Sequence, residues 1–427
     1  MNKSMRLESS VLSVAIASLF AVSLPVIAQD AEKSGDWGKP SGIPWGPVVA
    51  YPEVDLTFKR NDNIYSQPST VARKSSNITV LAPKLKLEAK TGPHTFDASY
   101  RVERGWFSGA SVENYTDHVL NANAQWVFSG RSGLKLSAAY QKMHEDRGSD
   151  PGIAAGTHSA PDEYTQSSVN GKLGYGAEGA QGRVELDAGF VGKRYDNFRS
   201  SATTGLADNS KRDRDDSTIG ATFFWRIAPK TQLLFQATQS KFDYTLSDAS
   251  FVAAGDVTRD NTERSYLVGV TWEAAAKTTG IFKVGSVKKD FSSSTRRDFS
   301  GGSWDATVKW SPLTYSTFDF NTGKAASEGT IGNAGLDSKY GVAWNHVWNS
   351  RLSSIASYNQ MQSDYQNNAG TGQTDKTNTL GLKLNYQWMR TVKIGAGYDR
   401  TDKTSDKRIT DTSHKKNIYS VFLNAAI

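Results

Sequence analysis

The fold is decided by the last nine residues, Tyr419-Ser420-Val421-Phe422-Leu423-Asn424-Ala425-Ala426-Ile427. Apolar side chains alternate there with smaller or polar ones, which is typical of a β-strand with one apolar face. Such a strand would promote aggregation at the edge of a soluble sheet. It is stable if it pairs with the first strand and closes a barrel in a membrane, so we predict a transmembrane β-barrel.

The same period of two continues upstream, from Val49 onward, with clear examples at residues 120–128 and 380–388. It recurs about eighteen times, an even number, as in single-chain bacterial barrels. Tryptophans stand at many strand ends, as in the aromatic girdles of such barrels. A soluble β-sandwich is the alternative, but it would not need so many strands with one apolar face each. The predicted fold class is therefore all-β, an antiparallel up-and-down transmembrane barrel.

The connections between the predicted strands alternate between short and long. Residues 91–93 and Ser311-Pro312 are short connections, whereas residues 288–302 and 323–337 are long ones. Outer-membrane barrels have short periplasmic turns and long extracellular loops. The first and last connections are both long, which places both ends of the barrel on the periplasmic side and agrees with an even strand number.

Composition excludes several other classes of protein. The chain has 427 residues, no cysteine and a formal net charge of +7. Its mean hydropathy of -0.52 argues against a helical membrane protein, which needs runs of about 20 apolar residues. The absence of cysteine removes disulfides, thiolate metal sites and cysteine nucleophiles. The mild basic bias allows an anionic ligand without requiring one.

The amino-terminal region carries the pattern of a secretory signal peptide. Lys3 and Arg6 precede an apolar run from Val11 to Ala28. A positive start, an apolar middle and a small residue at the end are typical of a cleaved leader; an uncleaved anchor helix is the alternative. We predict a signal peptide at residues 1–28, a periplasmic lead-in at 29–48 and the barrel at 49–427, in the outer membrane of a Gram-negative bacterium.

Polar residues alternate with the apolar ones and should face the lumen. This lining carries both signs of charge, with more cations than anions, and a barrel of this size leaves an aqueous channel unless something plugs it. The simpler interpretation of each residue is that it only hydrates the inside of the barrel, without contributing to a binding site. The basic candidates for the lumen lining are Lys84, Lys86, Arg101, Lys135, Lys172, Arg183, Lys309, Lys339, Lys383 and Lys393.

Catalysis has little support in the sequence. His144, Glu145 and Asp146 share one long connection with His158, and such groups could form a site at the rim of a barrel hydrolase. The simpler interpretation, which we prefer, is that these histidines have no partners, because nothing in the sequence fixes their geometry. No catalytic residue, cofactor site or metal site is predicted, and the protein is not expected to be an enzyme.

Several segments at the start of the barrel resemble a known family. Asp62-Asn63-Ile64-Tyr65 follows the first strand, and Pro83 lies in the second. Together with neighbouring segments they resemble a β-barrel porin family found with exopolysaccharide and capsule export genes. The resemblance covers nearly the whole mature chain and implies a role in export or assembly of a polysaccharide. One departure is Ile427, where outer-membrane barrels usually end in an aromatic residue.

Two other functions stay open. One is a general diffusion or solute-uptake porin, and the other is a structural sheath around another envelope protein. The expected partners are outer-membrane lipid and lipopolysaccharide, an anionic polysaccharide and periplasmic export proteins. No nucleic-acid partner is expected.

Overall fold

The structure is a computed structural model that describes residues 40–150, 153, 156–177, 179–199, 208–246, 258–274, 277–328, 334–366, 371–408 and 411–427. The predicted signal peptide, residues 1–28, and most of the predicted lead-in lie outside these ranges. No helix in the described part of the chain is long and apolar enough to span a membrane.

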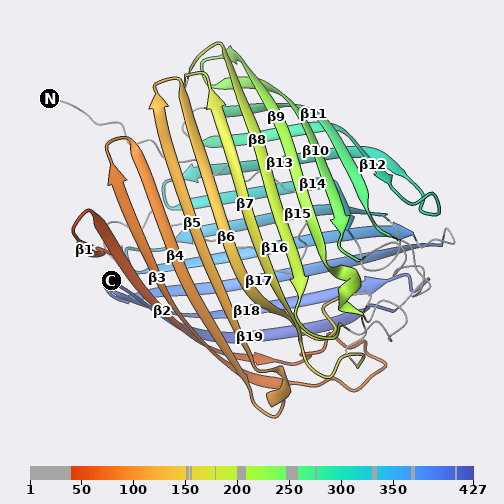
Figure 1. The fold of residues 1–427 in the computed structure, drawn as a ribbon. Coiled ribbons are helices and arrows are strands. Elements are labelled where there is room, and N and C mark those ends of the chain that lie inside the picture. The colour runs from red at the N-terminus through yellow and green to blue at the C-terminus, as the bar shows by residue number, and fades with distance from the viewer. Residues whose placement is uncertain are drawn as a thin grey trace.

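The described chain is almost entirely β-structure (Figure 1). The elements are β1 (Ile43–Trp45), β2 (Val48–Asn61), β3 (Ser76–Thr91), β4 (His94–Phe107), η1 (Ser111–Glu113), β5 (Tyr115–Ser129), β6 (Ser132–Glu145), β7 (Asp162–Tyr175), β8 (Gly182–Tyr195), η2 (Asn209–Arg212), β9 (Arg214–Ala228), β10 (Thr231–Tyr244), β11 (Asn261–Ala274), β12 (Thr278–Phe291), β13 (Phe299–Leu313), β14 (Ser316–Glu328), β15 (Ala334–Val347), β16 (Leu352–Gln366), β17 (Gly372–Met389), β18 (Val392–Ser405) and β19 (His414–Ala426).

Strands β2 to β19 form a closed antiparallel barrel, in which each strand pairs with the next along the chain. The terminal strand β19 pairs with β2 from Ile418↔Asn61 to Ala426↔Glu53 and closes the ring. Because closure leaves no long open edge, the apolar terminal strand is stable where it stands. The prediction of an up-and-down barrel of about eighteen strands is confirmed.

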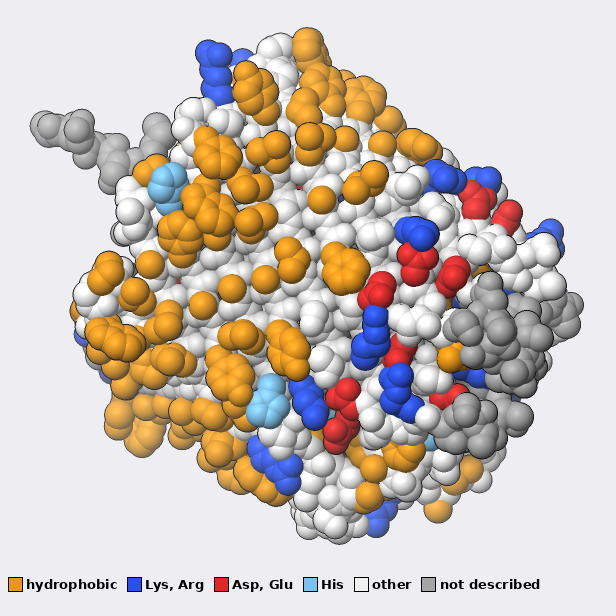
Figure 2. Space-filling view, in the orientation of Figure 1, with side chains coloured by type: hydrophobic (Ala, Val, Ile, Leu, Met, Phe, Trp, Pro, Cys, Tyr) orange, Lys and Arg blue, Asp and Glu red, His pale blue; other side chains and the backbone are white. Residues whose placement is uncertain are grey.

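The outward face of the barrel is apolar over a broad band. Phe58, Phe190 and Val268 are among the large apolar side chains exposed there. In Figure 2 apolar side chains cover the side nearer the short turns, and charged side chains replace them toward the long loops. This is the surface that a membrane barrel presents to lipid.

The described part of the predicted lead-in contains the short strand β1. A turn with Gly46 at φ +58° reverses the chain, so that Trp45 pairs with Val48 and Ile43 with Ala50. Strand β19 ends opposite Glu53, so β1 covers the part of the β2 edge that β19 does not reach.

The connections alternate in length as predicted, but several of their bounds were wrong. Strand β13 continues through Pro312 to Leu313, with a register shift between Trp310 and Leu313, so the turn lies at 314–315. A bulge tolerates a proline, which has no N–H to donate. The predicted loop at 323–337 shrinks to 329–333, because β14 and β15 stay paired after their outward residues become polar.

Candidate channel interior and loop cluster

Half of the basic lumen candidates lie beside acidic residues on the strand face opposite the apolar band. Lys84 Nζ lies 3.2 Å from Glu53 Oε2, and Lys86 Nζ lies 2.7 Å from Glu88 Oε1. Arg101 forms an ion pair with Glu103, two residues further along the same strand. These pairs neutralise much of the positive charge near β2–β4.

Lys172 and Arg183 form a second group on β7 and β8. Lys172 Nζ lies 3.1 Å from Glu185 Oε2 and 3.3 Å from Asp187 Oδ1. Arg183 Nη1 lies 2.7 Å from Glu185 Oε1, and its guanidinium also lies 4.2 Å from the centre of the Phe224 ring. This part of the wall is therefore charged but close to neutral.

The other lumen candidates have different surroundings. Lys135, Lys309 and Lys339 form no ion pair with any residue in the described ranges. Lys383 Nζ lies 4.5 Å from the centre of the Phe422 ring, and Lys393 pairs across strands with Asn424.

An apolar layer that was not predicted lies on the inner side of β9 and β10. Phe224 and Leu234 are cross-strand partners and are 3% and 1% exposed. Arg183 covers Phe224 from the neighbouring strand β8. The uninterrupted apolar runs at 223–225 and 233–235 were the available signal, because a one-sided strand would alternate.

At the long-loop end, Arg212 connects η2 to strands β6, β7 and β8. We call Glu145, Asp150, Asp162, Lys193 and Arg212 the Arg212 cluster. Arg212 lies 2.5 Å from Glu145, 3.0 Å from Asp150 and 2.8 Å from Asp162. Lys193 Nζ lies 2.8 Å from Glu145 Oε1. The cluster therefore joins the connection 146–161 to the connection 196–213.

The connection 146–161 also reaches other loops. Arg147 Nε donates to Glu113 Oε1 at 2.9 Å, and Arg147 Nη2 donates to Tyr65 Oη at 2.7 Å. Tyr65 lies in the connection after β2, and Glu113 lies in η1. The loops that follow β2, β4, β6 and β8 thus form one polar network on the β2–β9 side of the barrel.

The Arg212 cluster keeps Glu145 ionised. Desolvation acts to raise the pKa of Glu145, but the charges of Lys193 and Arg212, and hydrogen bonds from both, lower this pKa to about 2. Glu145 lies beyond the apolar band, since the outward positions of β6 change from Tyr140 to Lys142.

His144, near the end of β6, and His158 both have partners, so the prediction that they have none was wrong. His144 Nδ1 lies 2.9 Å from Asp117 Oδ1, and His158 Nδ1 lies 2.5 Å from Asp162 Oδ1. Burial acts to lower the pKa of His144, but Asp117 and Asp146 raise it to about 9. A protonated histidine held between two carboxylates stabilises the loop and is a poor general base at neutral pH.

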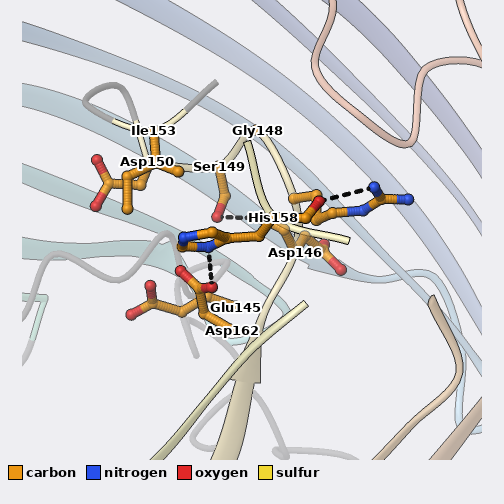
Figure 3. A pocket seen from close by; sticks show the side chains of 9 residues that line it. Glu145, Asp146, Gly148, Ser149, Asp150, Ile153, His158 and Asp162 are labelled. Atoms are coloured by element: carbon orange, nitrogen blue, oxygen red, sulfur yellow. Dashed lines mark hydrogen bonds and ion pairs between the residues drawn. The ribbon is translucent and has the colours of Figure 1, made fainter. Parts of the chain in front are cut away.

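Figure 3 shows the small cavity between these groups, with His158 directed at Asp162. Its volume of about 10 Å³ has room for about one water molecule and no substrate. No group of three or more His, Asp or Glu side chains in the described ranges could hold a metal ion.

The segment on which the family resemblance rests lies at the closing seam. Asp62 accepts hydrogen bonds from the backbone N–H of Asn417 at 2.7 Å and from its side-chain amide at 2.6 Å. Asn63 is fully buried and donates to the backbone oxygens of Gln67 and Lys415. These two side chains tie the end of β2 to β19.

Two further residues of the motif, Ile64 and Pro83, have structural roles. Ile64 packs in an apolar cluster with Ile78 and Phe107. Pro83 faces outward on β3, and the ladder between β3 and β4 omits it, as expected for a residue with no N–H. The motif is therefore structural at each of its residues.

A closed antiparallel barrel with an apolar outer band, a charged inner face and loops of unequal length at its two ends is a Gram-negative outer-membrane barrel of the porin type. The chain belongs to the family described as "Putative beta-barrel porin 2", whose model matches residues 37–425. This is a family of porins, which agrees with the prediction of a protein that is not an enzyme. No curated protein matches the chain significantly.

Several solved structures are similar in outline. OpdQ of Pseudomonas aeruginosa is 12% identical, with a TM-score of 0.46, over 90% of this chain and 99% of that one. OccAB3 of Acinetobacter baumannii is 11% identical, with a TM-score of 0.47, over 89% and 99%. The FrpB iron transporter of Neisseria meningitidis is 10% identical, with a TM-score of 0.44, over 88% and 81%. At these TM-scores, no property of those proteins is transferred to this one.

The match confirms that the chain belongs to a family of β-barrel porins, as the resemblance implied. Its matched description says nothing of polysaccharide export. The finer expectation of an export role has no support from the family match.

Proposed function

We propose that the protein is a passive channel that lets small polar solutes, with a preference for anions, diffuse through the outer membrane. The observation that carries this proposal is the charged inner face, on which Lys135, Lys309 and Lys339 have no ion pair with a described residue. Lysines in water-filled surroundings attract anions without holding them, because a conducting site must also release its solute. Membership in a porin family supports the same function.

Export or assembly of an exopolysaccharide or capsular polysaccharide is the second candidate. The three lysines favour it as well, because an anionic polymer could exchange contacts along them. The Arg212 cluster weighs against it, since this cluster ties two loops together at the end where a polymer would emerge.

The test is the conductance and ion selectivity of the refolded barrel in planar bilayers with a KCl gradient. We expect an open channel with a reversal potential that indicates anion preference. Changing Lys135, Lys309 and Lys339 together to Gln should shift this potential toward cation preference. Lys142→Gln is the matched control, because Lys142 is an exposed lysine on the outward face.

A barrel that does not conduct would contradict the channel. A selectivity that the triple variant leaves unchanged would contradict the role of the lysines. Addition of an anionic polysaccharide to one side separates the two candidates. Transit of the polymer to the other side would favour export, and a simple decrease in current would favour a channel for small solutes.

A further inference from the structure

Three tyrosines near the closing seam mark the edge of the apolar band. Tyr398 Oη donates to Asn417 Oδ1 at 2.9 Å, and Tyr358 Oη donates to Asn378 Oδ1 at 2.9 Å. Tyr419 is 56% exposed, and its ring lies 5.0 Å from that of Tyr398. Rings with an apolar body and a polar tip are stable at the level of lipid headgroups. The next outward positions therefore lie at the height of the headgroup phosphates.

Basic residues occupy outward positions at this level or just beyond it on four strands. Arg400 follows Tyr398 by two residues on β18, and Lys415 lies opposite Asp402 on β19. Lys376 lies on β17, and Arg60 lies opposite Tyr419 on β2. All four are exposed. We call Arg60, Lys376, Arg400, Asp402 and Lys415 the seam patch.

The seam patch is strongly positive. Its one acid, Asp402, lies 3.8 Å from Arg400 and 3.4 Å from Lys415. Arg60 donates only to neutral partners, Asn77 and Ser75. Lys376 has no ion pair with a residue in the described ranges. Four cations thus face one anion, and neighbouring like charges on a sheet are destabilising unless an anion lies between them.

The corresponding surface on β10–β12 is different. Lys241 forms an ion pair with Asp243 at 2.8 Å, and Arg264 and Lys288 share Asp290 at 2.9 and 2.7 Å. Most of the positive charge is neutralised there by the protein itself. The excess of outward cations at the seam patch is therefore not shared by β10–β12.

We propose that the seam patch binds the phosphates of a lipopolysaccharide molecule in the outer leaflet. Arginine and lysine form charge-assisted hydrogen bonds with phosphate oxygens. The acyl chains of the same molecule would lie on the apolar band directly below, where Leu380 and Val421 are exposed. A free phosphate ion would gain the first contact but not the second.

This site would stabilise the closure of the barrel. Strand β19 pairs with β2 only from Ile418 to Ala426, whereas β2 pairs with β3 along its whole length from Val48 to Asn61. Arg60 lies on one side of this short seam, and Arg400 and Lys415 lie on the other. A bound phosphorylated glycolipid would connect the two sides.

The test uses hexa-acylated, bisphosphorylated lipid A and the refolded barrel in detergent. Native mass spectrometry measures binding of the lipid, and thermal melting measures its effect on the stability of the barrel. We expect binding that weakens with salt and raises the melting temperature. The double variant R400A/K415A should bind at least about tenfold more weakly, since it loses two residues that form charge-assisted hydrogen bonds with phosphate. The control K241A/K288A removes the same charge on β10–β12 and should bind normally. Heat-modifiable migration in gels checks that each variant is folded.

Three results would overturn the proposal. One is equal binding of lipid A by R400A/K415A and the wild-type barrel. Another is equal binding of lipid A without its phosphates. The third is equal melting shifts with phosphatidylglycerol or with inorganic phosphate, which would indicate a general response to anions.

Discussion

Asn63 is an example of one side chain that holds two distant parts of the chain together. Its amide nitrogen donates to Gln67 O at 2.8 Å and to Lys415 O at 3.0 Å, and its oxygen accepts from the N–H of Gln67 at 2.9 Å. Only an amide offers donors and an acceptor in this arrangement. The side chain is fully buried, so its own polar atoms depend on these backbone partners.

We therefore expect Asn63→Ala to destabilise the barrel by about 1–3 kcal/mol, because the backbone groups of Gln67 and Lys415 lose the side chain that joins them. The measurement is the urea midpoint of the barrel in lipid vesicles, followed by intrinsic fluorescence. Ser69→Ala is the control, since Ser69 is exposed in the same connection. Equal midpoints for the two variants would show that Asn63 is not needed at the seam.

At the scale of elements, the Arg212 cluster places η2 against the strands. Asp208 accepts from the N–H of Ser210 at 2.9 Å and so fixes the start of η2. Arg212 then forms ion pairs with acids from β6, β7 and the connection between them. Several buried charges depend on this single guanidinium, which is 9% exposed.

Removal of one partner from a buried ion pair costs about 3–5 kcal/mol, because the other charge is left without compensation. We expect Arg212→Ala to release the connections 146–161 and 196–213 without unfolding the barrel. Hydrogen exchange of peptides from these two connections should accelerate, while β14–β18 peptides stay protected. Arg400→Ala is a control of the same chemistry at an exposed position. Unchanged exchange in the two connections would contradict this role of Arg212.

The same cluster predicts a response to acid. The pKa of Glu145 is lowered from 4.5 to about 2, so its contribution to loop order is complete above pH 4.5 and is lost as the pH falls toward 2. We expect more frequent current fluctuations at pH 3 than at pH 7 in single-channel recordings. Glu145→Gln should fluctuate at both pH values, whereas the exposed Glu163→Gln should behave like the wild type. Identical recordings of the wild-type channel at pH 3 and pH 7 would contradict the prediction.

At the scale of the whole molecule, successive residues of each strand face two environments in turn, the lipid outside the barrel and the water inside it. Phe235 is 49% exposed on the outward face of β10, and Thr238 lies on the opposite face of the same strand. A lysine on the lipid face of a barrel costs about 2–4 kcal/mol near the middle of the membrane, whereas a lumen position meets water.

We expect Phe235→Lys to lower the stability of the refolded barrel by at least about 2 kcal/mol, and Thr238→Lys to change it much less. The measurement is the guanidinium midpoint of each variant in vesicles. A similar loss in both variants would contradict the assignment of the two faces.

The fold could be predicted from the sequence because each strand carries its own signal. The alternating pattern at 419–427 depends only on which face of the strand meets lipid, and that is a local property. Turn positions were less certain, since a ladder can continue past the last apolar residue and through a proline at a bulge, as it does at Pro312.

The charged interior was predictable only in part. The basic residues of the strands could be assigned to the face opposite the apolar one, but their partners could not. Lys172 meets Glu185 and Asp187 because of the register between β7 and β8. His158 meets Asp162 at the start of β7, where Arg212 holds the same carboxylate from a distant connection.

The sequence by itself determined the barrel, its even strand number and the direction of its two ends, since period, parity and loop length are readable along the chain. Only the tertiary structure decided which charges neutralise one another, how the loops of β2–β9 join, and where cations remain in excess. The physical reason is that ion pairs depend on distances of a few ångströms between residues far apart in sequence. Closure of the barrel sets those distances, when β19 meets β2 and brings Asn417 to Asp62.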